Sequence, residues 1–280
     1  MSARNFRRQS MYGELKAIDV MKCQIYLIGN AGILLEINKK PFLIDGLYSA
    51  DGKGFQTSPI PEKICQNLLE NTGELPSPDY LLFSHPHFDH LSEKLLCSYL
   101  TGHRPKAVFL PRQGNSHYEA CRRIMKEKQI CCKLVSEDTN YKVGKYTEIR
   151  YIKTRHLGKT FGEMMHFCII VNVCQASFLF TADTDFFSEK FKEFPQKHFD
   201  GIFVNPLFYH NSEGQEILKN TLSAERFFVY HLPFLEDDRY HLQNMVKKDI
   251  RAYGQDKKVT VFASPGQVIE YEIQKGEEKL

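Results

Sequence analysis

The stretch "LLFSHPHFDHLS" at residues 81–92 decides the expected fold, because it places metal-binding side chains directly after an apolar run. His85, His87, Asp89 and His90 all fall within six positions. A single histidine is usually an ordinary core or surface residue, but four such groups at one strand end are typical of a metal or catalytic site. The cluster therefore predicts the first part of a metal-binding constellation.

The backbone expected around the cluster brings its side chains together. If residues 81–84 end a strand, His85 and His87 point to the same side of the extended chain, because alternate residues share a face. Pro86 between them disfavours helix at His85, and a helix is expected from about Ser92. Imidazole nitrogens with carboxylate oxygens suit zinc, with manganese or iron as alternatives, and the group is large enough for two adjacent divalent ions.

Composition and charge limit the class of protein. The chain has 280 residues, of which 42% are hydrophobic, enough for one large α/β domain or two small ones. It has no apolar run of about eighteen residues, the length that a membrane-spanning helix needs. Residues 1–20 are basic but lack the apolar core of a secretory signal, so we expect an N-terminal extension and a single domain over residues 21–280.

The expected partner is a small molecule rather than a nucleic acid. The net charge is +3 and the pI is near 8.3, whereas a nucleic-acid-binding domain usually has a pI above about 9. The chain has eight cysteines without a C-x-x-C pair, which favours reduced thiols and a cytoplasmic location over a secreted disulfide scaffold. The sequence leaves a homo-oligomer open.

Short apolar runs predict strands, and periodic segments between them predict helices. The expected strands are residues 23–29, 32–37, 41–45, 79–84, 106–111, 147–154, 166–173, 177–183, 201–206, 226–231, 259–265 and 267–273. The expected helices are residues 59–73, 92–100, 116–129 with a Ser116 cap, and 237–254 ending at Gly254. No G-x-G-x-x-G follows an early strand, so the pattern favours two sheets with outer helices over one dinucleotide-binding sheet.

Further metal ligands should also come from strand ends, and His156, Asp183 and His231 fit. Taken singly, an aspartate at a strand end is commonly a turn former, and a lone histidine there is usually bonded to backbone. His166, at the start of the next strand, competes with His156 as a ligand. We prefer His156 because it closes a strand and a Lys/Gly loop follows it.

The order of these residues resembles that of a known family. Asp45 in "FLIDG", then "HPHFDH", His156, Asp183 and His231 follow the five landmarks of the metallo-β-lactamase superfamily, from about residue 23 to 273. The HxHxDH string is highly specific, and the other landmarks are strong in their order. The resemblance implies an αβ/βα sandwich, which is a four-layer α/β fold with two central mixed sheets, outer helices and an active site at one edge between the sheets.

The resemblance also implies a role for each residue. One metal ion would be held by His85, His87 and His156, and the second by Asp89, His90 and His231, with the Asp183 carboxylate bridging them. Asp45 would support the site from outside, because such partners orient ligating histidines. A water or hydroxide shared by two ions has a lowered pKa and attacks an ester, phosphoester or amide, so Asp89 and Asp183 would be catalytic ligands.

Several branches of the superfamily differ from this chain. Class B β-lactamases carry cysteine at the Asp183 position, and flavodiiron proteins carry glutamate at the His87 position. The helical domain that glyoxalase II-like thioesterases add after the last histidine has no counterpart after His231, nor has the large domain that β-CASP nucleases insert before it. The tRNase Z group stays open, although no glycine-rich basic arm is present. "DHLS" and "FTADTDFF" are similar to the branch of ascorbate-6-phosphate lactonase-like and N-acylphosphatidylethanolamine phospholipase D-like proteins, with Ala182 and Asp185 in place of glycines.

The favoured function is an intracellular dinuclear hydrolase that cleaves an ester, lactone or phosphodiester of a small molecule. A nuclease or phosphodiesterase acting on nucleic acid or a cyclic nucleotide is an alternative, which a basic groove leading to the metals would favour. A non-catalytic metal-binding or interaction protein is another, against which the complete ligand set argues. Tyr209 and His210 in "NPLFYHNSEG" and Lys159 are the candidates for substrate contacts.

Overall fold

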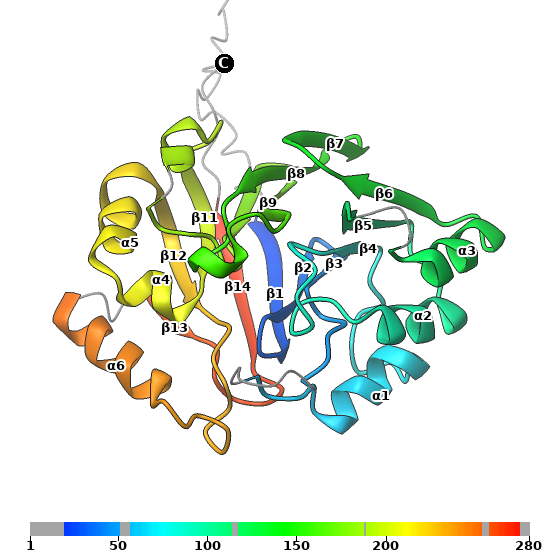
Figure 1. Cartoon of the computed structure of the whole chain (residues 1–280), viewed down its shortest axis with the longest axis horizontal. Coiled ribbons are helices and arrows are strands. Elements are labelled where there is room, and N and C mark those ends of the chain that lie inside the picture. The colour runs from blue at the N-terminus through cyan, green and yellow to red at the C-terminus, as the bar shows by residue number, and fades with distance from the viewer. Residues whose placement is uncertain (1–19, 51–56, 114–116, 188, 254–257, 275–280) are drawn as a thin grey trace, which may run out of the picture.

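Two seven-stranded sheets face each other, and helices cover the outer side of each sheet (Figure 1). This arrangement is that of a computed structural model, which describes residues 20–50, 57–113, 117–187, 189–253 and 258–274. The predicted αβ/βα sandwich with two mixed sheets and outer helices is confirmed. The predicted extension at residues 1–20 lies outside the described residues, except that β1 begins at its last residue.

The first sheet has the strand order β14-β1-β2-β3-β4-β5-β6. Its strands are β1 (Val20–Gly29), β2 (Gly32–Ile37), β3 (Lys40–Ile44), β4 (Tyr80–Leu82), β5 (Ala107–Pro111), β6 (Cys131–Val135) and β14 (Val268–Gln274). Strands β3 to β6 are parallel and the others antiparallel. On its outer side lie α1 (Glu62–Glu70), α2 (Glu93–Gly102) and α3 (Glu119–Glu127) (Figure 1).

The second sheet has the strand order β13-β12-β11-β10-β9-β8-β7. Its strands are β7 (Thr139–Gly144), β8 (Thr147–Thr154), β9 (His166–Val173), β10 (Ala176–Phe180), β11 (His198–Val204), β12 (Ser223–Val229) and β13 (Val259–Val261). The helical segments are η1 (Lys159–Phe161), η2 (Glu189–Glu193), α4 (Pro206–His210), α5 (Ser212–Glu216), η3 (Ile217–Thr221) and α6 (Leu242–Tyr253). Within the described ranges, no helix has the length and apolar character that crossing a membrane requires.

Apolar side chains fill the space between the layers. One cluster lies between the two sheets. A second lies between the second sheet and its helices, and a third lies between the first sheet and its helices. In the first cluster, the Phe180 and Phe203 rings stack with centroids 4.3 Å apart. Burial on both faces explains why β5 and β10 read as continuous apolar runs rather than alternating ones. This packing holds the strand ends in place.

Some elements differ from the expected bounds. The last long helix begins at Leu242 rather than at residue 237, because the Asp238 carboxylate accepts hydrogen bonds from the backbone N–H groups of Leu242 and Gln243. The expected Ser116 cap and the stop at Gly254 lie outside the described residues. The sequence patterns do not predict β6, β7, α4 or α5. Helix α4 forms where a loop is expected because the Asn205 side chain caps it, accepting from the Phe208 N–H at 2.8 Å.

The two sheets place the ends of several strands at one edge of the sandwich. Strands β3 and β4 are parallel, and β8, β10 and β12 share one direction, because β9 is antiparallel to both β8 and β10. Backbone hydrogen bonds join the sheets there: the Phe167 N–H donates to the Ser84 carbonyl at 3.1 Å, and the His231 N–H donates to the Asn30 carbonyl at 3.0 Å. Residues that follow these strands therefore meet.

Gly214 marks the closest approach of α5 to α4. A Cβ at this position would lie 1.9 Å from the Phe208 carbonyl oxygen. We expect Gly214→Ala to lower the free energy of unfolding by about 1–3 kcal/mol, because a clash with backbone cannot be relieved by rotating a side chain. Urea denaturation of the variant and of the unaltered protein measures this difference in the free energy of unfolding.

Gly102→Ala is the matched control, because its Cβ would lie 3.5 Å from the nearest atom, the Leu69 carbonyl oxygen. We expect it to change stability by no more than about 0.5 kcal/mol. Equal stability of the two variants would contradict the packing described.

Candidate metal centre

Histidine and aspartate side chains converge where the strand ends of the two sheets meet. They form two groups, within each of which the candidate ligand atoms all lie within 4.8 Å of one another. The first group is His85, His87, His156 and Asp183, and the second is Asp89, His90 and His231. The structure thus brings together every residue that the sequence predicts as a metal ligand.

Four segments of the chain position these groups. The segment between β4 and α2 carries the "HPHFDH" cluster, and its continuation is fixed by the Ser92 cap, whose Oγ accepts from the Leu95 N–H at 3.3 Å. His156 follows β8, Asp183 follows β10, and His231 follows β12. The candidate ligands thus stand just after strands of both sheets.

The distances within the first group suit one metal ion. His87 Nδ1 lies 3.1 Å from both His85 Nε2 and His156 Nε2. Asp183 Oδ2 lies 3.8 Å from His85 Nε2 and 3.7 Å from His156 Nε2. Ligands bonded at about 2.0–2.1 Å to one tetrahedral ion are separated by roughly 3.3 Å. The donor set therefore fits zinc or a similar ion.

The second group lies beside the same carboxylate. His90 Nε2 lies 2.9 Å from His231 Nε2, which is 3.6 Å from Asp89 Oδ2. Asp183 Oδ2 lies 3.4 Å from His90 Nε2, and Asp183 Oδ1 lies 3.6 Å from His231 Nε2. Asp183 thus faces imidazoles of both groups.

A buried network orients two of the histidine rings. Asp45 is fully buried and accepts hydrogen bonds from the Ser84 N–H at 2.8 Å and the Ser84 hydroxyl at 2.6 Å. Its carboxylate lies 2.9 Å from His90 Nδ1, and Ser84 Oγ lies 2.9 Å from His85 Nδ1. With Nδ1 held, each ring directs Nε2 into the cluster. The sequence analysis does not identify Ser84 as a residue of the site. The only indication in the sequence is that Ser84 is a polar residue at the end of an apolar run.

His166 and Asn205 also act on the cluster without joining either group. The backbone N–H of Asp183 donates to His166 Nε2 at 3.1 Å, while His166 Nδ1 lies 2.8 Å from Thr154 Oγ1. Asn205 Nδ2 donates to the Ala182 carbonyl at 2.8 Å and lies 3.4 Å from Asp183 Oδ1. Both residues therefore hold the segment that carries Asp183. In the sequence, His166 is marked only by its place at the start of a strand, and Asn205 only by its place just after one.

Burial keeps several imidazoles neutral. It lowers the pKa of His85 well below the usual value and the pKa of His87 to about 4. Burial also lowers the pKa of His156, although the Asp183 carboxylate opposes this shift. Neutral imidazole is the form that binds metal. These three side chains are therefore ready to coordinate.

His90 and Asp183 behave as a charged pair. Burial alone would lower the pKa of His90, but the carboxylates of Asp45 and Asp183 raise it well above the usual value. Burial alone would raise the pKa of Asp183, but His231 and His90 lower it well below its usual range. His90 therefore lies between two carboxylates, Asp45 and Asp183, that favour its protonated form.

The backbone beside the cluster is strained at several strand ends. Asn30, Asp45, Ala182 and His231 have φ angles of 40°, 47°, 48° and 57°, in the left-handed region that non-glycine residues rarely adopt. Such residues cost on the order of 1 kcal/mol or more each and persist only where surrounding structure holds them. Ala182 stands where the resembling branch has glycine. Strained backbone therefore lies directly beside the histidine and aspartate cluster, where the surrounding structure must hold it.

A pocket of about 520 Å³ lies over the cluster. Cluster residues form its floor, and its walls are mainly apolar. The walls include Phe88, Leu157, Phe161, Leu207, Tyr240 and Leu242, and Thr57 and Asn205 add polar groups. A small molecule can therefore reach the histidines and carboxylates.

The expectation for Tyr209 and His210 as substrate contacts is corrected. The Tyr209 side chain is fully buried in the core beneath α4, with its ring 6.0 Å from that of Tyr253. His210 is exposed and its Nδ1 lies 2.9 Å from Asp249 Oδ2 on α6. Neither is in the described pocket lining, because helix α4 presents Leu207 to the pocket while it buries Tyr209 and turns His210 toward α6. Lys159 is exposed on η1 and is also absent from the described lining.

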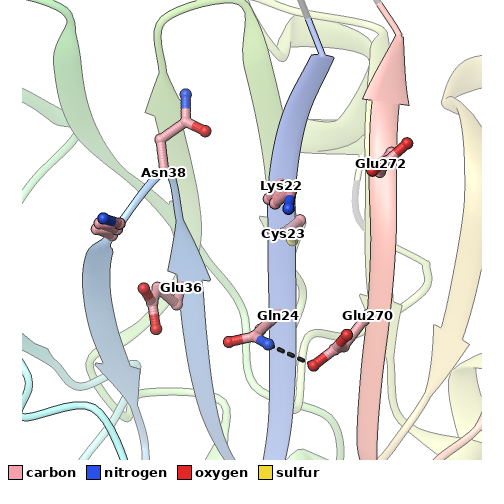
Figure 2. Close-up of a pocket in the computed structure, with 8 residues that line it drawn as sticks. Lys22, Cys23, Gln24, Glu36, Asn38, Glu270 and Glu272 are labelled. Carbon is pink, nitrogen blue, oxygen red and sulfur yellow. Dashed lines mark hydrogen bonds between the residues drawn. The ribbon is translucent and has the colours of Figure 1, made fainter.

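A larger hollow, of about 630 Å³, lies over β2, β1 and β14 and away from the cluster (Figure 2). Lys22, Gln24, Glu36 and Glu270 are among its lining residues, and the Gln24 amide donates to the Glu270 carboxylate. It includes none of the residue groups that could hold metal in the described ranges. The larger of these two cavities is therefore not the one that contains the candidate metal ligands.

Comparison with known proteins identifies the fold. No protein-family model and no curated protein matches the sequence. The chain is similar to Igni18, a metallo hydrolase from Ignicoccus hospitalis, with 14% identity, a TM-score of 0.60, and coverage of 90% of this chain and 100% of that chain. It is similar to the metallo-β-lactamase fold protein YhfI from Bacillus subtilis (16% identity, TM-score 0.59, coverage 89% and 100%). An isothiocyanate hydrolase from Delia radicum gut bacteria is also similar, with 13% identity, a TM-score of 0.59, and coverage of 89% of this chain and 100% of that chain. The chain has the metallo-β-lactamase fold.

Replacing the buried Asp45 carboxylate tests the network beneath the cluster. Asparagine keeps the size and tolerates the left-handed backbone at this position. We expect Asp45→Asn to lower the free energy of unfolding of the metal-free protein by about 1.5–3 kcal/mol, because bonds to a charged group are lost. Urea denaturation of protein treated with chelator measures it.

Asp79→Asn is the matched control. Asp79 Oδ2 lies 2.7 Å from Lys106 Nζ at the surface, where an ion pair contributes at most about 1 kcal/mol. If both variants lost equal stability, the Asp45 network would not have the importance assigned to it.

Proposed function

We propose that this chain is a metal-dependent hydrolase that holds two divalent ions at the edge between its sheets. The observation that carries the proposal is the Asp183 carboxylate, which faces imidazoles of two separate ligand groups. The similar structures named as hydrolases support it through their shared fold. The dinuclear ligand set is compatible with each observed distance.

The proposed assignment follows the two groups. His85, His87 and His156 would hold one ion, Asp89, His90 and His231 would hold the other, and the Asp183 carboxylate, which faces both groups, would contribute to each. Mixed nitrogen and oxygen ligands favour zinc, and manganese and iron also accept them. A histidine must be neutral to bind a metal ion, so metal binding at this group would depend on pH.

The chain's own residues prepare the site for hydrolysis. Bound ions of this kind polarise a carbonyl or phosphoryl oxygen and lower the pKa of water, so that no nucleophilic serine or cysteine is needed. Asp89 and Asp183 border the pocket, so the ions they would hold are reached by a molecule bound there. Asp45 and Ser84 keep two histidine rings in orientation.

The proposed substrate is a small molecule with an ester, lactone or phosphodiester bond. The pocket of about 520 Å³ is of the size that encloses small ligands. A nuclease is less favoured, because the described pocket lining has no lysine or arginine to meet a phosphate backbone. The eight free cysteines suit a reducing, cytoplasmic compartment.

Metal content tests the proposed ligands. We expect purified protein to hold two divalent ions per chain, and His85→Ala to hold at most one, because an imidazole nitrogen of the first group is lost. Inductively coupled plasma mass spectrometry after removal of loosely bound ions measures this. His210→Ala is the control, because His210 pairs with Asp249 outside the cluster. Equal metal content in both variants would refute the assignment.

Activity tests the hydrolase itself. We expect metal-loaded protein to hydrolyse at least one substrate in a panel of esters, lactones and phosphodiesters, and to lose the activity with a chelator. Asp183→Asn should lower kcat/KM at least about 100-fold, the upper end of the loss caused by removing an outer partner of a ligand. A fully metal-loaded protein without activity on the whole panel would favour a non-catalytic metal-binding protein.

A further inference from the structure

We propose that the pocket selects a substrate whose group beside the scissile bond is uncharged and apolar. The inference rests on the proposed hydrolase function and names the substrate class of that site. It is carried by the residues that line the pocket, in particular by Phe161, Leu207 and Tyr240.

The apolar wall begins directly at the metal-binding cluster. The Phe161 ring centroid lies 4.7 Å from that of His87 and 5.3 Å from that of His156. Phe88 and Leu157 continue the wall on either side. A group bonded to a reacting carbon above these histidines would therefore contact hydrocarbon rather than polar atoms.

Large apolar side chains remain in contact with water at this pocket. Leu207 is 46% exposed and Tyr240 is 73% exposed, and both line it. An apolar substrate group seated between them removes hydrocarbon surface from water on both sides, which favours binding in proportion to the area covered.

The charges around the pocket disfavour an anionic substrate group. The only aspartates, glutamates, lysines or arginines in the described lining are Asp89 and Asp183, which belong to the cluster. Arg155 faces Asp185 instead, with its Nε donating to the carboxylate at 2.6 Å, and Lys159 lies outside the lining. A carboxylate or phosphate held away from the metals would lose hydration without gaining a cation. The nucleic-acid substrates considered as an alternative from the sequence are therefore disfavoured.

A matched pair of ligands tests the preference without any reaction. N-phenylpentanamide and N-phenylsuccinamate have similar size and shape, but only the second carries a carboxylate. We expect the neutral amide to bind metal-free protein at least about tenfold more tightly in isothermal titration calorimetry, a ratio typical of small changes in an apolar pocket. Equal or tighter binding of the succinamate would overturn the proposal.

Leu207→Lys places a cation on the pocket wall. We expect it to weaken binding of the neutral amide about tenfold and to strengthen binding of the succinamate. Leu235→Lys is the matched control, because Leu235 is 75% exposed and lies outside the described lining. It should bind both ligands as the unaltered protein does. If Leu207→Lys fails to fold by thermal melting, Leu207→Ala should weaken binding of the neutral amide alone. A variant of Leu207 that changes neither affinity would overturn the proposal.

The reaction separates this inference from the proposed function. The metal-loaded protein is assayed with 4-nitrophenyl pentanoate and 4-nitrophenyl hemisuccinate, and only the rate lost with a chelator is counted. We expect the pentanoate to have the higher kcat/KM by about tenfold or more. A higher value for the hemisuccinate overturns the substrate class and leaves the hydrolase standing. Absence of hydrolysis across the whole panel, with the neutral amide still preferred, overturns the hydrolase alone.

Discussion

The buried Asp45 carboxylate is the interaction on which the rest of the site depends. It stands at the end of β3 and contacts Ser84 and His90, both of which follow β4. A buried charge is costly unless it is paired and hydrogen-bonded, and here the Ser84 N–H, its hydroxyl and the His90 ring meet that requirement. Because Ser84 also contacts His85, one carboxylate determines the orientation of a ring in each ligand group.

This polar network is stable only because the apolar layers hold it. The left-handed backbone at Asp45, Ala182 and His231 is unfavourable by itself. The strands before these residues are packed between a second sheet on one face and helices on the other, so the turns have little freedom to relax. The Asn30 carbonyl accepts a hydrogen bond from the His231 N–H. This bond ties the turn after β1 in the first sheet to the segment after β12 in the second sheet.

The sequence places the cluster through the order of its residues, which resembles that of the metallo-β-lactamase superfamily, because a single aspartate or histidine at a strand end is usually an ordinary residue. Strand ends then explain why these side chains lie together, since parallel strands of a sheet end at the same edge, although His156 follows the mixed polar and apolar strand β8. Tyr209 and His210 do not follow this pattern, because the Asn205 cap starts a helix that buries one side chain and turns the other toward α6. The contributions of Ser84 and His166 also depend on distances across the fold, and no local pattern in the sequence encodes these.

The floor and the walls of the pocket therefore have different origins. The floor is built from strand ends, whose positions follow from the sheets and are common to the fold. The walls come from connecting segments: Phe161 from η1, Leu207 from α4, and Tyr240 from the turn before α6. Such segments vary in sequence without disturbing the strands beneath them. On the proposed function, the residues placed by the sheets would thus support hydrolysis in general, while the apolar side chains of these three segments would decide which molecule approaches them.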